Sequence, residues 1–276
     1  MARENFVLMH GQVRGDPRIT INNDGEIIKA MFTLRVLRRP TTNAEMSGKL
    51  QIDCPVVYTR NADMAKQIQN LRDGDMVDIR GAISSRECRK STICPECGTK
   101  NIKDGNIVYV TPIYMCQRGN VDDKAGLALL KERAEISNLV NVIGNLCRDP
   151  DYYVDASNRK YAQYQLAVNR RYRIKEDMEE VRTDYPWVKT FGMQAYNDSE
   201  GLHTGSCVYI SGAIQTREIE RSCTCGKCGA EYKWKDSAAE IVPYYIGYLA
   251  NCTIPEVNEE VQTEDGEETQ CSEQAE

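Results

Sequence analysis

The sequence has no apolar segment of about 18 residues, the minimum length of a membrane-spanning helix. Its N-terminal residues also contain no apolar stretch typical of a signal peptide. We therefore expect a cytoplasmic protein without a membrane span. Histidine is scarce as well: only His10 and His203 occur, and neither is close to a cysteine cluster. Because a metalloenzyme needs a convergent set of histidines and carboxylates, we do not expect a metalloenzyme.

The net charge of −6 is concentrated at one end of the chain. The segment after Thr253 contains nine acidic residues and no lysine or arginine, which leaves 35 basic against 32 acidic residues elsewhere. A slightly basic body with an acidic tail indicates an anionic partner. A solvated tail without a partner would produce the same pattern, and charge alone leaves both interpretations open.

The chain repeats itself at a spacing of 131 to 133 residues. The segment NFVLMHGQVRGDP at residues 5–17 is matched by NLVNVIGNLCRDP at residues 138–150. The segment DMVDIRGAISSRE at residues 75–87 is matched by SCVYISGAIQTRE at residues 206–218. Because the matched segments occur in the same order, they predict a duplicated domain.

Each half is predicted to consist mainly of strands, with one helix. Apolar residues alternate with a period of two at residues 7–13, 30–36 and 77–83. Residues 61–71 have helical periodicity instead, with Met64, Ile68 and Leu71 on one face. Three strands, a helix and two strands are the order of an OB-fold, a five-stranded Greek-key barrel. The prediction is therefore an all-β protein of two tandem OB-fold barrels, with domains at residues 1–116 and 138–253, a linker at 117–137 and a disordered acidic tail at 254–276.

These segments resemble the bacterial single-stranded DNA-binding proteins. That family begins with a strand of the form N-x-V-x-L-x-G-x-L-x-x-D-P, and it contains a later strand similar to VYISGAIQTR at residues 208–217. It also ends in an acidic tail. The resemblance covers residues 5–115 and 138–250, and it implies an OB-fold, binding of single-stranded DNA and a location at the nucleoid. It further implies a homodimer, and replication or repair proteins as candidate partners.

Single-stranded DNA binding without sequence preference requires aromatic rings for base stacking and cations along the backbone. Strand alternation at residues 184–192 predicts one face with three rings and one cation: Tyr185, Trp187, Lys189 and Phe191. The resemblance implies stacking at Tyr172, Tyr185 and Phe191. The other candidates for nucleic-acid contact are Arg35, Arg38, Arg39, Tyr58, Arg60, Arg86, Arg170, Arg171, Arg173 and Arg217. The alternative is that some rings fill the barrel core, or that Trp187 lies at an interface.

The two halves are predicted to contribute differently to binding. The first-half strand equivalent to residues 184–192 contains Tyr58 as its single ring, and Pro40 occupies the position that matches Tyr172. The first half therefore keeps cations but has fewer rings. We expect stacking mainly from the second half and electrostatic attraction from the first.

Twelve cysteines are many for this chain, and eight of them form two clusters. The first consists of Cys88, Cys94, Cys97 and Cys116, and the second of Cys223, Cys225, Cys228 and Cys252. Both contain a C-x-x-C-G motif between the fourth and fifth strands, which is typical of tetrahedral zinc sites. We expect two structural Zn²⁺ ions, one in each half, although the fourth ligand of each is undecided. Unliganded thiols or a redox pair are the alternatives.

The predicted function is non-enzymatic binding and protection of single-stranded DNA in replication, recombination or repair. The alternative is a scaffold subunit with OB-folds and zinc ribbons that binds RNA or protein within a larger complex. A stacked Trp187 would separate the two functions, because a scaffold has no reason to stack bases on it.

Overall fold

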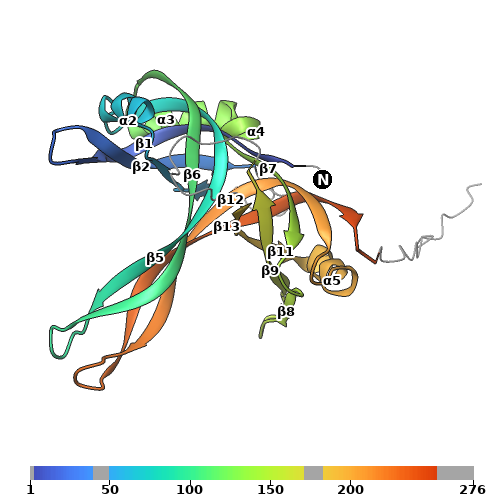
Figure 1. Cartoon of the computed structure of the whole chain (residues 1–276). Helices are drawn as coiled ribbons and strands as arrows, with labels where there is room; N and C mark the ends of the chain where they lie inside the picture. The colour runs from blue at the N-terminus through green and yellow to red at the C-terminus, as the bar shows by residue number, and fades with distance from the viewer. Residues whose placement is uncertain (1–2, 40–49, 171–182, 254–276) are drawn as a thin grey trace, which may run out of the picture.

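The computed structural model describes residues 3–39, 50–170 and 183–253 (Figure 1). The acidic tail and the candidates Arg171, Tyr172 and Arg173 lie outside the described residues, as does Pro40. None of the helices described is long and apolar enough to cross a membrane.

The first half forms a closed five-stranded barrel. Its strands are β1 (Asn5–Ile21), β2 (Ile27–Arg38), β4 (Val56–Thr59), β5 (Asp75–Ile93) and β6 (Lys100–Asn120), with a short β3 (Gln51–Asp53) beside β2. Strand β1 pairs with β2, β2 with β4, β4 with β6 in parallel, β6 with β5, and β5 with β1. This closed ring is the OB-fold topology, as predicted.

The second half repeats this topology. Its elements are β7 (Asn138–Leu146), β8 (Asp151–Val154), β9 (Lys160–Asn169), β10 (Thr183–Asp184), β11 (Trp187–Phe191), α5 (Gly192–Gly201), β12 (Cys207–Thr224) and β13 (Glu231–Ala250). Strands β7, β9, β11, β13 and β12 close the barrel, again with one parallel pair, β11 with β13. The predicted duplication therefore extends to the strand pairing.

The predicted helix of the first half is α2 (Ala62–Gln69). It begins at Asn61, whose side chain accepts hydrogen bonds from the backbone N–H groups of Asp63 and Met64. Met64 and Ile68 are buried against the barrel, and so is Leu71 just after the helix. The periodicity thus identified the correct face.

The connection between the halves is packed against the first barrel. It contains α3 (Asp123–Glu132) and α4 (Ala134–Ser137). Leu130 of α3 is fully buried and clusters with Leu37 and Met76. These contacts fix the connection to the barrel.

The two barrels share one sheet, which the sequence analysis did not predict. Strand β1 pairs antiparallel with β7, so that Asn5 lies opposite Val142 and Met9 opposite Asn138. One cluster of buried apolar residues includes members from both halves, for example Val7 and Val140. The halves therefore fold against each other as one body.

Two long ribbons extend from the barrels. Strands β5 and β6 continue as a two-stranded ribbon, arm 1 (residues 86–107), and β12 and β13 continue as arm 2 (residues 217–238). Figure 1 shows the arms side by side, with both tips at the same end of the molecule. Each tip is a C-x-x-C-G turn in which the glycine, Gly98 or Gly229, has a positive φ of 67° or 73°. Glycine adopts this conformation without steric cost, which explains its place in both turns.

Candidate nucleic-acid interface and metal centre

Each half contains a buried ion pair whose carboxylate also accepts a hydrogen bond from the other half. Arg38 pairs with Asp53 at 3.0 Å, and the Thr216 N–H of the other half donates to the same carboxylate at 2.7 Å. The second half mirrors this arrangement: Arg170 pairs with Asp184 at 2.7 Å. The Asp184 carboxylate also accepts from the N–H of Ser85 in the first half, at 2.8 Å.

These pairs change the expected role of two arginines. The side chains of Arg38 and Arg170 are only 12% and 9% exposed. Burial raises the pKa of Asp53, against the opposing effect of the Arg38 charge, as expected of a desolvated carboxyl. The prediction that Arg38 and Arg170 contact nucleic acid is corrected accordingly, because each guanidinium group is paired with a buried carboxylate of its own half.

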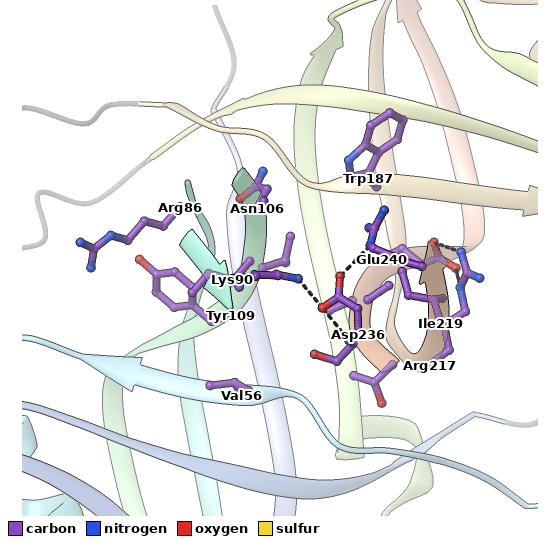
Figure 2. Close-up of a pocket in the computed structure, with 18 of the residues that line it drawn as sticks. Val56, Arg86, Lys90, Asn106, Tyr109, Trp187, Arg217, Ile219, Asp236 and Glu240 are labelled. Carbon is purple, nitrogen blue, oxygen red and sulfur yellow. Dashed lines mark hydrogen bonds and ion pairs between the residues drawn. The ribbon is translucent and has the colours of Figure 1, made fainter. Parts of the chain in front are cut away.

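A cavity of about 890 Å³ lies between the arms and the outer faces of both barrels. Figure 2 shows its two walls, with Arg86 and Tyr109 on one side and Trp187 and Arg217 on the other. Among the described residues, its lining contains five aromatic rings: Tyr58, Tyr109, Tyr153, Trp187 and Trp234. Both tryptophans of the chain are therefore at this cavity.

Strand β11 has the two faces that the alternation predicts. Pro186, Val188 and Thr190 are buried, whereas the residues between them point outward. Tyr185 is 44% exposed and Phe191 is 48% exposed. The alternative in which these rings fill the barrel core is wrong for this strand.

Cations lie close to the outward rings. The Lys189 Nζ is 4.5 Å from the ring centroid of Tyr161 and 5.6 Å from that of Phe191. The Arg148 guanidinium lies 5.0 Å from the Trp187 ring. Burial, with a smaller effect of the Arg217 charge, lowers the pKa of Lys189. Ring and cation thus alternate across this surface, as base stacking with phosphate contact requires.

Several residues at this surface were missed by the sequence analysis. They are Arg148, Tyr153, Tyr161 and Trp234. Tyr153 and Tyr161 stack with their centroids 5.1 Å apart. Tyr153 lies on β8 and Tyr161 lies on β9, and β9 pairs with both β8 and β11. Only the pairing of these strands brings the two rings to the same surface as β11. The alternation of exposed residues in 160–169 was the available signal.

Other predicted cations have protein partners. Arg35 donates to the backbone carbonyl of Asp123 at 2.9 Å, beneath α3, and does not line the cavity. Arg39 lies over the ring of Tyr244, outside the cavity. Arg217 pairs with the buried Glu240 at 2.9 Å. Arg86 is exposed at the cavity.

The side chains of Tyr58 and Arg60 are joined by a hydrogen bond. The Arg60 Nε donates to the Tyr58 hydroxyl at 3.1 Å. Tyr58 is half-buried at the cavity, and Arg60 is exposed. The one ring predicted in the first half therefore lies at the same surface as Trp187.

Four cysteines meet where the arm tips touch. Cys94 and Cys97 from arm 1 and Cys225 and Cys228 from arm 2 have sulfur atoms within 4.8 Å of one another. The Cys94 and Cys228 sulfurs are 3.7 Å apart, and those of Cys97 and Cys225 are 3.6 Å apart. Four thiolates at about 2.3 Å from a tetrahedral ion would be separated by about 3.8 Å. The cluster therefore has the size of a metal site.

The prediction of one metal site in each half is wrong in its grouping. Cys88 lies opposite Gly105 along arm 1, and Cys116 lies opposite Asp78 in the barrel. Cys223 lies opposite Tyr232, below the tip, and Cys252 lies beside Cys207. Each C-x-x-C motif contributes two of the four clustered thiols, so that the cluster combines both halves. Among the described residues, the four cysteines at the tips form the one cluster of this kind.

Comparison with known proteins agrees with the fold. The model of the "Single-strand binding protein family" matches residues 137–227. The single-stranded DNA-binding protein of Staphylococcus epidermidis is 32% identical over 84 residues, 30% of this chain and 62% of that protein. Single-stranded DNA-binding protein B of Bacillus subtilis is 35% identical over 83 residues, 30% of this chain and 72% of that protein. The chain thus spans less than two thirds of the Staphylococcus relative.

Solved structures match over nearly the whole chain. A deletion variant of the single-stranded DNA binding protein from Thermus aquaticus has a TM-score of 0.58 at 18% identity, over 93% of this chain and 100% of that one. The wild-type protein has a TM-score of 0.55 at 17% identity, over 90% and 95%. These matches support the fold. The barrels and the ring-lined cavity define an OB-fold protein with a candidate nucleic-acid surface. The Bacillus relative shows that the chain belongs to the single-strand binding protein family, whose model matches residues 137–227.

Proposed function

We propose that this protein binds single-stranded DNA without catalysis, in replication, recombination or repair. The observation that carries the proposal is the outward row of rings on β11, which continues into the cavity between the arms. Relatives named as single-stranded DNA-binding proteins support it. Unpaired bases stack on the rings, and lysine and arginine neutralise the phosphates.

The proposed interface combines predicted and added residues. It consists of Tyr58, Arg60, Arg86, Arg148, Tyr153, Tyr161, Tyr185, Trp187, Lys189, Phe191, Arg217 and Trp234. Arg171, Tyr172 and Arg173 remain predictions outside the described residues. Each stacked base contributes about 1–3 kcal/mol, and stacking tolerates any sequence because every base has a flat face.

Tryptophan fluorescence tests this function directly, because both tryptophans line the cavity. We expect oligo-dT to quench the emission, and the affinity to fall with salt by a log–log slope of about −0.7 per phosphate neutralised. Double-stranded DNA and RNA of the same length are the controls. Unchanged emission with oligo-dT, together with binding to RNA, would instead favour the scaffold function.

We also propose that the four-cysteine cluster holds one Zn²⁺ ion. Soft thiolate donors in a tetrahedral arrangement favour zinc, and such sites are structural because no position is left open for substrate. The sulfur separations of 3.6 and 3.7 Å support this proposal.

The zinc content of the purified chain distinguishes a shared site from one site in each half. We expect one Zn²⁺ per chain by elemental analysis, whereas the sequence alone predicted two. Cys97→Ser should lose the ion, and Cys116→Ser should retain it, because only the first removes a ligand. Loss of zinc in the Cys116 variant would restore the original grouping.

The family resemblance supports two finer proposals about assembly. They are a homodimer, and contacts with replication or repair proteins at the nucleoid. Sedimentation of the full chain tests the first, and co-purification with and without residues 254–276 tests the second.

A further inference from the structure

The arms contact each other or the opposite half at three levels. At the base, Ser85 binds Asp184, and Thr216 binds Asp53. Farther out, the Lys90 ammonium of arm 1 pairs with Asp236 of arm 2 at 2.6 Å. At the tips, the four cysteines meet. The cavity lies between the base and the tips, so the contacts at the tips control the spacing of its walls.

The contact at the middle level is a small polar network. Asp236 is 5% exposed and also accepts from Arg221 at 2.7 Å. Burial opposes ionisation of Asp236, but the hydrogen bonds from Lys90 and Arg221 outweigh it, so that its pKa is lowered. Beyond this network, the described part of the chain provides no apolar core for the arms: Ile93 is 69% exposed and Ile102 is 58% exposed.

The tips are arranged around the cysteine cluster by polar contacts from both arms. The Asn101 side chain of arm 1 donates to the Tyr232 hydroxyl at 3.1 Å and accepts from the Gly226 N–H at 3.0 Å. Cys94 and Cys225 are buried there, although both lie at the far end of exposed ribbons. Two-stranded ribbons are marginally stable alone, so a cross-link at the tips has a large effect on their position.

We propose that one metal ion, bound by two thiolates from each arm, clamps the arms at the spacing that single-stranded DNA requires in the cavity. This inference rests on the proposed function. The four thiols release four protons as the divalent ion binds, and no electron is transferred. The clamp positions Trp234 on arm 2, while Tyr109, which packs against Tyr58 on the first barrel, and Trp187 stay in place on their barrel strands.

The metal is therefore required for the cavity, but not for the barrels. Without it, the arms separate beyond the Lys90–Asp236 pair, and Trp234 moves away from the nucleotide base that stacks on it. The rings of β11 keep the nucleotide bases that stack on them. We expect the affinity for oligo-dT to fall by roughly 5- to 150-fold, which corresponds to the loss of one stacked base.

The test compares two double variants of the full chain, Cys97→Ser/Cys228→Ser and the matched control Cys116→Ser/Cys252→Ser. Both are made in a Trp187→Phe background, in which Trp234 is the only tryptophan, and in a Trp234→Phe background. Circular dichroism monitors the barrels. We expect the first variant to lose its metal, to keep its strand content and to lose quenching of Trp234, but not of Trp187. The control should behave as its background does.

Three other results have distinct meanings. Equal oligo-dT affinity of metal-loaded and metal-free protein overturns the clamp and leaves the proposed function intact. Absence of binding to every form overturns the proposed function itself. Protein that is purified without metal, and in which the four cysteines at the tips react with an alkylating reagent only after reduction, contains disulfides, and this result overturns the metal as the cross-link.

Discussion

The double variant Trp187→Ala/Phe191→Ala is expected to lose about 2–6 kcal/mol of binding free energy for oligo-dT, at about 1–3 kcal/mol per stacked base. Both rings lie on the outward face of β11, whose buried face is formed by Val188 and Thr190. The substitutions therefore remove stacking surface without opening a cavity in the core. Fluorescence anisotropy with labelled oligo-dT at low salt measures the loss.

The matched control is Tyr114→Ala, which removes a ring that is 55% exposed and does not line the cavity. Its affinity should stay within about twofold of the unchanged protein, because an isolated exposed ring contributes little. If the double variant binds as tightly as the Tyr114 variant, the stacking surface lies elsewhere.

The second large effect is on stability. Asp184→Ala is expected to lower the free energy of unfolding by about 3–5 kcal/mol, because it removes the buried carboxylate that pairs with the Arg170 guanidinium. It also removes the acceptor for the Ser85 N–H, which belongs to the other half. Against a total stability of about 5–15 kcal/mol, the loss is large. Denaturant titration followed by circular dichroism measures it.

Glu220→Ala is the control for this variant. Glu220 pairs with Lys233 at 3.3 Å on the surface of arm 2, with both side chains more than 60% exposed. Surface ion pairs contribute about 0–1 kcal/mol, so little change is expected. Similar losses in the two variants would mean that the Asp184 pair does not hold the halves together.

Much of the local structure was predictable because it depends on short-range periodicity. Alternating residues identified the outward face of β11, and helical spacing identified the buried face of α2. The position of the C-x-x-C-G motifs between the fourth and fifth strands was also correct, because each motif is a tight turn. These features depend on neighbours within a few residues.

The predictions for Arg38 and Arg170 were wrong although their partners are only 15 and 14 residues away in the chain. Arg38 and Arg170 are arginines at the end of a strand, which is equally compatible with a phosphate contact and with a buried ion pair. Their partners, Asp53 and Asp184, were visible in the sequence, but their burial was not. The pairing of β1 with β7 decides that burial, because it brings the two halves into contact.

The sequence by itself determined that the chain is duplicated, that each half is an OB barrel, and that outward rings follow β11. All three depend on repeated motifs and on the alternation of strand residues, which local sterics enforce. Only the tertiary structure decided that the two C-x-x-C turns share a cluster and that both halves line one cavity. The physical reason is that a pair of cysteines can complete a four-thiol site with a second pair from its own half or from the other half. The short distance between the two arm tips decides in favour of the other half.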